Sequence, residues 1–190
     1  IRPSRGLGDV YKRQLFGGID LVLGPNLIVG AGSTRGGLIR NFATVDNQTT
    51  IEVLNPGTGL TLAATVFTNS NTVRTGPNGG NLSLSGLLNN GLVETNTGTT
   101  TTLLGNWSNP TGTLQVNGGT LNLDGNFSGL GTFNRPGGAG TVNLTGTFTN
   151  TGNVFTFDDT TGVFNFDTGQ ITGGTPVSYT HLRAHETVVY

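Results

Sequence analysis

The chain contains no cysteine and no methionine, and only 10% of its 190 residues are charged. Without cysteine there are no disulfides, thiolate nucleophiles, zinc–thiolate sites or iron–sulfur ligands. A formal net charge of −1 gives no electrostatic reason to expect a nucleic-acid partner. No apolar run approaches the roughly 20 residues that a membrane-spanning helix needs. Because the chain begins at Ile1 and has no methionine, we expect it to be a fragment or a processed product.

Chemically reactive side chains are scarcer in the middle of the chain than at its ends. Residues 15–176 contain no tyrosine, histidine, lysine, cysteine or methionine, whereas all tyrosines, both histidines and the single lysine lie outside them. This step in composition predicts a non-native flank at 1–14, a native domain at 15–176 and a second non-native flank at 177–190. The strings at 5–14 and 177–187 resemble translated sequencing-adapter read-through.

The second flank has one alternative interpretation, a metal-binding tail. His181 and His185 are spaced i, i+4, which on a helix places both on one face, with Glu186 beside them. Two histidines at this spacing are a weak match to any metal motif, so we favour the non-native flank. Within 15–176, four arginines stand against eight acidic residues, which gives the domain a net charge of −4.

The domain repeats with a period of about 20 residues. Four segments align without gaps, at 82–88, 101–107, 121–127 and 142–148, and each has inward-type residues at alternate positions. Alternation with period 2 is typical of a strand with one buried face. A weaker copy lies at 60–66, and other strand-like runs lie at 21–23, 27–29, 51–53, 114–116, 154–157 and 163–166. The aligned segments share three columns: Leu84/Leu103/Leu123/Leu144, Gly86/Gly105/Gly125/Gly146 and Leu88/Trp107/Phe127/Phe148.

The columns favour a parallel β-solenoid over an antiparallel sandwich. In a solenoid each turn lays its strands on those of the previous turn, so similar residues stack at one position of every rung. Asn90, Asn109 and Asn150 also recur four residues after the glycine, with Gly129 interrupting the series, and stacked amides hydrogen-bond along the axis. Glycine, asparagine and threonine are poor helix formers. We predict an all-β solenoid of about eight rungs, each of about 20 residues.

The string at 112–127, GTLQVNGGTLNLDGNF, resembles the autotransporter-associated β-strand repeat. That repeat occurs in right-handed parallel β-helix passenger domains of bacterial surface and secreted proteins. The likeness is clear from about residue 82 to 175 and loose before it. It implies a right-handed parallel β-helix at the cell surface or outside the cell, acting as a stalk, an adhesin or a surface-layer component.

Two stretches carry enzyme-like signals. Gly30, Gly32 and Gly36 follow a strand-like run, and Glu52 lies about twenty residues on, as in a dinucleotide-binding unit. That unit needs a helix opening at Gly32, and the residues after Gly36 predict another solenoid strand instead. Asp158, Asp159 and Asp167 form the one local acidic cluster; we weigh a weak Ca²⁺ site against a solvated turn and favour the turn.

Three further signals have simple structural interpretations. Trp107 would stack on a sugar ring if it faced outward, but its column predicts that it lies in the core. The threonine tract at 95–102 is a single tract rather than the array of an ice-binding solenoid. Five N-x-S/T sequons, at Asn47, Asn81, Asn106, Asn126 and Asn143, carry no weight in a chain so rich in asparagine and threonine.

We therefore expect an extracellular structural or adhesive β-solenoid segment of a bacterial surface or secreted protein, and not an enzyme. We assign no catalytic, cofactor-binding or metal-binding residue. Expected partners are surface carbohydrate or protein and further rungs of a longer chain, without nucleic acid or a membrane span. The alternative is a fragment of a polysaccharide-active β-helix enzyme, which carboxylates and basic residues converging on one face of neighbouring rungs would support.

Overall fold

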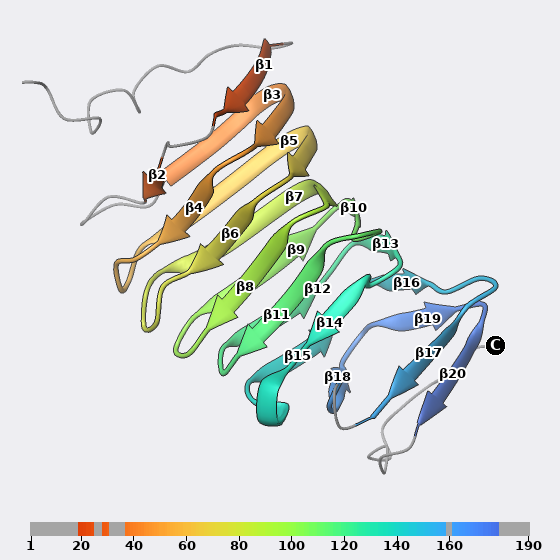
Figure 1. The fold of residues 1–190 in the computed structure, drawn as a ribbon. Helices are drawn as coiled ribbons and strands as arrows, with labels where there is room; N and C mark the ends of the chain where they lie inside the picture. The colour runs from red at the N-terminus through yellow and green to blue at the C-terminus, as the bar shows by residue number, and fades with distance from the viewer. Residues whose placement is uncertain (1–18, 25–27, 31–36, 159–160, 179–190) are drawn as a thin grey trace, which may run out of the picture.

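The structure is a computed structural model that describes residues 19–24, 28–30, 37–158 and 161–178. Figure 1 shows strands stacked turn upon turn along one axis. The stack has about 7 turns of about 21 residues, one turn fewer than the sequence spacing suggests. Among the described residues, the one helical element is a short 3₁₀ turn at Pro136–Gly138. The predicted β-solenoid is confirmed.

The strands form three sheets. The twelve-stranded sheet contains β1 (Ile19–Leu23), β3 (Gly37–Asn47), β5 (Gly59–Asn69), β7 (Asn81–Asn89), β9 (Thr100–Leu104), β10 (Asn106–Ser108), β12 (Thr120–Leu123), β13 (Asn126–Ser128), β15 (Thr141–Leu144), β16 (Thr147–Thr149), β18 (Phe164–Phe166) and β19 (Gln170–Thr172). The six-stranded sheet contains β2 (Ile28–Gly30), β4 (Thr50–Val53), β6 (Thr72–Thr75), β8 (Leu92–Asn96), β11 (Thr113–Asn117) and β14 (Thr132–Asn134). The two-stranded sheet contains β17 (Val154–Phe157) and β20 (Thr175–Ser178).

All pairs between these strands are parallel, and each strand pairs with the equivalent strand one turn away. Leu103, for example, lies opposite Leu84 on one side and Leu123 on the other. An antiparallel sandwich would instead join neighbouring strands of the chain by hairpins. Among the described residues, the antiparallel contact is a single isolated bridge between Asn96 and Gly118. The register therefore excludes hairpins over 82–148.

The core is built from columns of apolar side chains that point into the stack. The predicted leucine column is confirmed: Leu84, Leu103, Leu123 and Leu144 pair in order and are fully buried. The six-stranded sheet adds a second column from the other side, which consists of Ile51, Val73, Val93 and Leu114. Burying one such side chain stabilises a fold by about 1.5–3 kcal/mol, so columns that repeat on successive turns stabilise the stack along its length.

The aromatic column is confirmed from Trp107 onward. The rings of Trp107 and Phe127 stack with centroids 4.1 Å apart, and those of Phe127 and Phe148 stack at 5.0 Å. Trp107 is 4% exposed, which confirms that it belongs to the core. The prediction for the first member of the column was wrong. Leu87 is buried there, whereas Leu88 faces outward and pairs with Ser108.

A one-residue difference between rungs explains this error. Ser85 pairs with Leu104 and Leu88 pairs with Ser108, so two residues of β7 lie opposite three residues of the next turn. The extra residue sits at the corner, where Gly105 takes a left-handed conformation at φ 67°. An insertion of this kind bends the chain without disturbing the pairing on either side. An alignment without gaps therefore places Leu88 at the core position that Leu87 occupies in the structure.

The same offset moves the predicted asparagine ladder. Its member in β7 is Asn89, which is fully buried, and not Asn90, which is exposed. The ladder also extends further towards the N-terminus than predicted, through Asn69 to Asn47. Each Nδ2 donates to the Oδ1 of the next asparagine along the series Asn47, Asn69, Asn89 and Asn109, at 2.7–2.8 Å.

The ladder ends after Asn109, where the Nδ2 donates to the carbonyl oxygen of Leu130. This confirms the interruption expected at Gly129. Asn150 is buried but lies outside the ladder, because its Nδ2 donates to the carbonyl oxygen of Asn153. The prediction that Asn150 belongs to the series was therefore wrong. Four consecutive rungs share the ladder.

At the C-terminal end, β17 and β20 do not join the six-stranded sheet but pair with each other. Phenylalanine rings fill the space beneath them. Phe155 meets Phe148 edge-on with centroids 5.4 Å apart, and Phe157 meets Phe164 at the same distance. Strand β20 reaches Ser178, two residues beyond the predicted domain boundary at 176. The predicted flank at 1–14 and residues 179–190 of the second flank lie outside the described residues, as do His181, His185 and Glu186.

Candidate functional site

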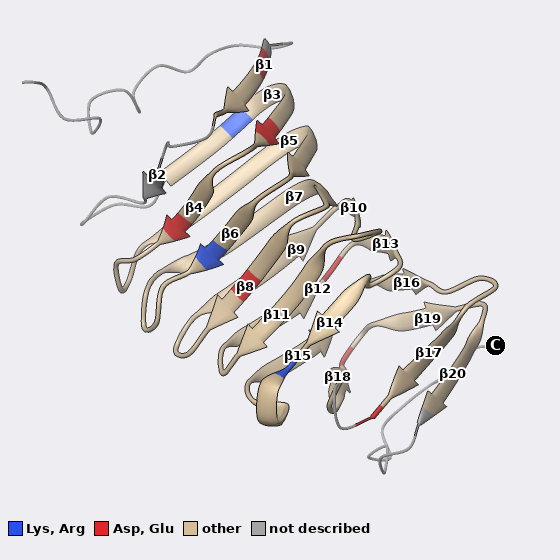
Figure 2. Ribbon diagram, in the orientation of Figure 1, with Lys and Arg blue, Asp and Glu red and all other residues tan. Residues whose placement is uncertain are grey.

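The charged residues of the solenoid are few, and three of them meet on the outer face of the six-stranded sheet. Figure 2 shows an acidic, a basic and an acidic segment on the neighbouring strands β4, β6 and β8. They are Glu52, Arg74 and Glu94, which lie directly opposite one another in the parallel register. Gln115 of β11 continues the series. We call Glu52, Arg74, Glu94 and Gln115 the charged column.

Alternation along each strand explains why these side chains point outward. In β4, β6, β8 and β11 the residues on either side of the charged column are buried, so the column itself must face solvent. The strands are about 4.8 Å apart, so the column offers one polar group at that interval along the solenoid axis.

One end of the charged column is an ion pair. The Nε of Arg74 donates to Oε1 of Glu52 at 2.8 Å. The side chain of Arg74 remains 40% exposed, and that of Glu52 is 16% exposed. A guanidinium has five N–H donors, and the terminal amino groups of Arg74 make no hydrogen bond to the described part of the chain. Those donors therefore remain open to solvent or a ligand.

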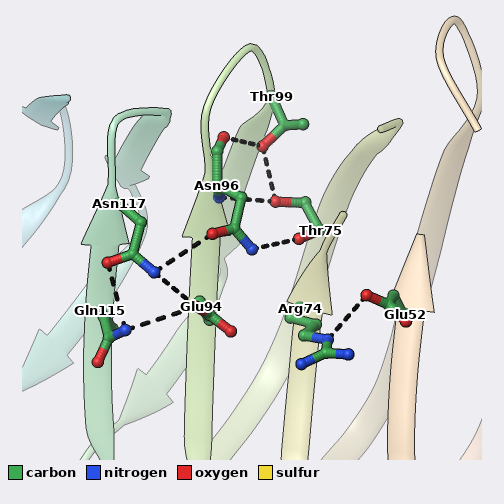
Figure 3. Close-up of polar contacts among 8 residues, drawn as sticks. All are labelled: Glu52, Arg74, Thr75, Glu94, Asn96, Thr99, Gln115 and Asn117. Carbon is green, nitrogen blue, oxygen red and sulfur yellow. Dashed lines mark hydrogen bonds and ion pairs between the residues drawn. The ribbon is translucent and has the colours of Figure 1, made fainter. Parts of the chain in front are cut away.

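The other end is a network of amides around Glu94, drawn in Figure 3. Its Oε1 accepts a hydrogen bond from Nδ2 of Asn117 at 2.5 Å and a longer one from Nε2 of Gln115 at 3.5 Å. Asn117 also donates to Oδ1 of Asn96 at 3.2 Å. These contacts come from β8 and β11, so the two strands hold the Glu94 carboxylate in one orientation.

Asn96 fastens this network to the backbone of the neighbouring turn. Its Nδ2 donates to the carbonyl oxygen of Thr75 at 2.5 Å, and its backbone N–H donates to Oγ1 of Thr75 at 2.9 Å. The hydroxyls of Thr75 and Thr99 are 2.6 Å apart, and both residues are buried. The polar groups at the surface are thus anchored to hydrogen bonds inside the fold.

The ion pair at one end of the charged column and the amide network at the other meet between Arg74 and Glu94. These residues are paired across adjacent strands, yet no ion pair or hydrogen bond joins their side chains. The open amino groups of Arg74 and the second carboxylate oxygen of Glu94 therefore face the same stretch of surface. This places a charged donor and a charged acceptor side by side.

The outer face of the twelve-stranded sheet carries a different polar series. Asn165 donates to Asn143 at 3.0 Å, Asn143 donates to Asn122 at 2.8 Å, and Asn122 donates to Oγ1 of Thr102 at 3.2 Å. This ladder is uncharged, and its amides are largely occupied with one another.

Of the dinucleotide-binding signal, Gly30 and Glu52 lie directly opposite each other in the parallel register of β2 and β4, and Glu52 belongs to the charged column. Gly30 ends β2, Gly32 and Gly36 lie outside the described residues, and the chain continues as strand β3 rather than as a helix. Glu52 pairs with Arg74. The threonine tract at 95–102 spans a turn between β8 and β9, so its hydroxyls are divided between the inside and the outside of the fold.

Asp158 belongs to a turn, as expected. Its Oδ1 accepts a hydrogen bond from the backbone N–H of Thr161 at 3.0 Å, and its carbonyl oxygen accepts one from Gly162 at 2.7 Å. Asp167 is exposed at the end of β18, and Asp159 lies outside the described residues. Within the described ranges, no three histidine, cysteine or acidic residues are grouped as a metal site. The Ca²⁺ interpretation stays untested.

One buried charge was not predicted from the sequence: Arg135, which is 8% exposed. Its Nε donates to the carbonyl oxygen of Ala139 at 3.0 Å, and its Nη1 donates to that of Val163 at 2.7 Å. Its Nη2 donates to the carbonyl oxygen of Gly140. Burial lowers the pKa of Arg135. These bonds join the 3₁₀ turn to the next rung, so the role of this residue is structural.

No family model matches the chain, and no curated protein or solved structure matches it. The class that its register and ladders define is a parallel β-solenoid with two polar outer faces. None of the described segments forms a helix with the length and hydropathy of a membrane span.

Proposed function

We propose that the chain is an extracellular structural and adhesive segment of a bacterial surface or secreted protein, with no catalytic activity of its own. The observation that carries this proposal is the continuous parallel register, which repeats the same outward positions on every turn. Such a stack is a rod that presents extended polar faces, because each repeat contacts its neighbours alone. The resemblance of 112–127 to the autotransporter-associated repeat supports a location at the cell surface.

The side-chain chemistry also supports a binding role rather than catalysis. Residues 15–176 offer no histidine, lysine, tyrosine or cysteine for proton transfer or nucleophilic attack. Polar groups on both faces are engaged in ladders that fix their orientation. Fixed donors and acceptors lower the entropy lost on binding.

The alternative, a polysaccharide-active enzyme, is favoured by one observation. Glu52, Arg74 and Glu94 converge on one face of neighbouring rungs, and two strand spacings of about 4.8 Å separate the backbones that carry the carboxylates. Inverting glycosidases hold their carboxyl groups roughly 6.5–9.5 Å apart. Against this, both carboxylates are already engaged, Glu52 in the ion pair with Arg74 and Glu94 in hydrogen bonds from Asn117 and Gln115.

An adhesion measurement tests the proposal. Beads coated with the full chain are applied under flow to surfaces coated with polysaccharides or with extracellular proteins. We expect retention on at least one of these surfaces, well above that of beads coated with an unrelated all-β protein of similar net charge. Retention no better than the control on every surface would contradict the adhesive role.

A further inference from the structure

We propose that the outer face of the six-stranded sheet around Arg74 and Glu94 binds a neutral polysaccharide that lies along the solenoid axis. This proposal rests on the adhesive function above and names the class of its ligand. We call the site the polar strip and define it by the charged column together with Asn117.

The polar groups of the strip are complementary to a hydroxyl group. A sugar hydroxyl donates one hydrogen bond and accepts others, as the hydroxyls of serine and threonine do. The free amino groups of Arg74 are donors, and the free oxygen of Glu94 is an acceptor, on directly paired positions of adjacent strands. A hydroxyl placed between them accepts from the guanidinium and donates to the carboxylate. Hydrogen bonds to charged groups are the stronger kind.

The side chains of the strip are held in place before any ligand binds. Arg74 is fixed by its bond to Glu52, and Glu94 is fixed by Asn117 and Gln115. The amide network reaches the buried hydroxyl of Thr75 through Asn96. A site whose side chains are already ordered loses little conformational entropy on binding.

The charge of the strip favours a neutral ligand. Two carboxylates and one guanidinium leave the charged column with a net charge of −1, so an acidic polysaccharide would be repelled. A bound cation would lie beside Arg74, and a hard cation such as Ca²⁺ needs six to eight oxygen ligands. The neighbouring outward column is uncharged and consists of Thr50, Thr72, Leu92, Thr113 and Thr132. A neutral polyhydroxylated chain is not repelled by the carboxylates, and it needs no cation to bind.

The direction of the strip suits a linear polymer. The charged column runs across successive strands, so its groups follow the solenoid axis at intervals of about 4.8 Å. A linear polymer laid along this axis meets a polar side chain on each rung from β4 to β11. A single sugar would contact one or two rungs, whereas a chain engages the whole column and adds the contacts together.

Titration calorimetry with the full chain tests the proposal. The neutral probes are dextran, laminarin and mannan, and the acidic probe is polygalacturonate. Arg74→Ala and Glu94→Ala each remove one partner of the bridging hydroxyl, so binding should weaken at least about tenfold. Arg40→Ala is the matched control, because it removes the same charge from an exposed site on β3 of the other sheet. Thermal unfolding followed by the fluorescence of Trp107, the single tryptophan, confirms that each variant is folded.

We expect binding of at least one neutral probe, weaker binding of polygalacturonate, and an affinity of Arg40→Ala within about twofold of the unaltered chain. The proposal is overturned if no neutral probe binds, or if folded Arg74→Ala and Glu94→Ala bind as tightly as the unaltered chain. If the proposal is overturned in either way but the coated beads of the adhesion measurement are still retained, the adhesive function holds and its binding site lies elsewhere on the chain. Beads that adhere to nothing contradict the adhesive function itself.

Discussion

Asn69 donates a hydrogen bond from Nδ2 to Oδ1 of Asn89 at 2.7 Å, and both side chains are fully buried. The Nδ2 of Asn69 also reaches the carbonyl oxygen of Leu92 at 3.1 Å, while its Oδ1 accepts the backbone N–H of Asn71. Each amide thus links its own turn to the next. A slip of one residue would turn every buried amide outward, so the ladder sets the register of successive rungs.

Replacing Asn89 with alanine should destabilise the fold strongly. The change removes the acceptor for Asn69 and the donor to Asn109 inside the core, and each buried polar group left unpaired costs about 1–3 kcal/mol. We expect the free energy of unfolding in urea to fall by roughly 2–4 kcal/mol. Asn90→Ala is the control, because Asn90 is exposed, and it should change the free energy by less than about 0.5 kcal/mol. Similar losses for both variants would refute the placement of the ladder.

Gly125 should tolerate no side chain. It has φ 71°, and a Cβ at this position would lie 2.0 Å from the carbonyl oxygen of Gly105 in the turn below. Gly152 has nearly the same φ, 76°, but a Cβ there meets nothing within 4 Å. Gly152→Ala therefore carries the conformational penalty alone, about 1–2 kcal/mol, and Gly125→Ala adds a steric clash. Chemical denaturation should show a distinctly larger loss for Gly125→Ala, and equal losses would argue against close stacking of the corners.

Thr101→Val should stabilise the protein. The Oγ1 of Thr101 is buried without a hydrogen bond, and its neighbours in the column are Leu82 and Leu121. Valine has nearly the same shape and removes the unpaired hydroxyl, so we expect a gain of about 1 kcal/mol in thermal or chemical unfolding. Thr102→Val is the control, because Thr102 faces outward and accepts a hydrogen bond from Asn122. A gain for Thr102→Val, or a loss for Thr101→Val, would contradict the inward and outward assignments.

Much of the twelve-stranded sheet was predictable because its rungs resemble one another. Leu103, Leu123 and Leu144 recur with the period of the turn and stack as expected. The position of Leu88 was not predictable, since the insertion at the Gly105 corner leaves no mark in a gapless alignment. A side chain one residue along a strand faces the opposite side, so this small offset exchanged a core residue for a surface residue.

The polar strip escaped prediction for a different reason. Glu52, Arg74 and Glu94 are unlike one another, and they lie on short strands such as β6 that carry few apolar residues. The sequence pattern therefore does not indicate that these three residues meet. Their grouping depends on rung lengths that differ by one or two residues, and the register of the structure supplies those lengths. Arg135 was missed because its partners are backbone carbonyls, which no sequence motif marks.

The central claim is that this solenoid binds through its outer face without performing chemistry. The measurement that tests it most directly follows new reducing ends and unsaturated products when the full chain is incubated with polygalacturonate, dextran, laminarin and mannan. We expect no product above buffer, from the unaltered chain or from Glu94→Gln and Asp158→Ala. Products that the unaltered chain releases and that either variant abolishes would contradict the central claim.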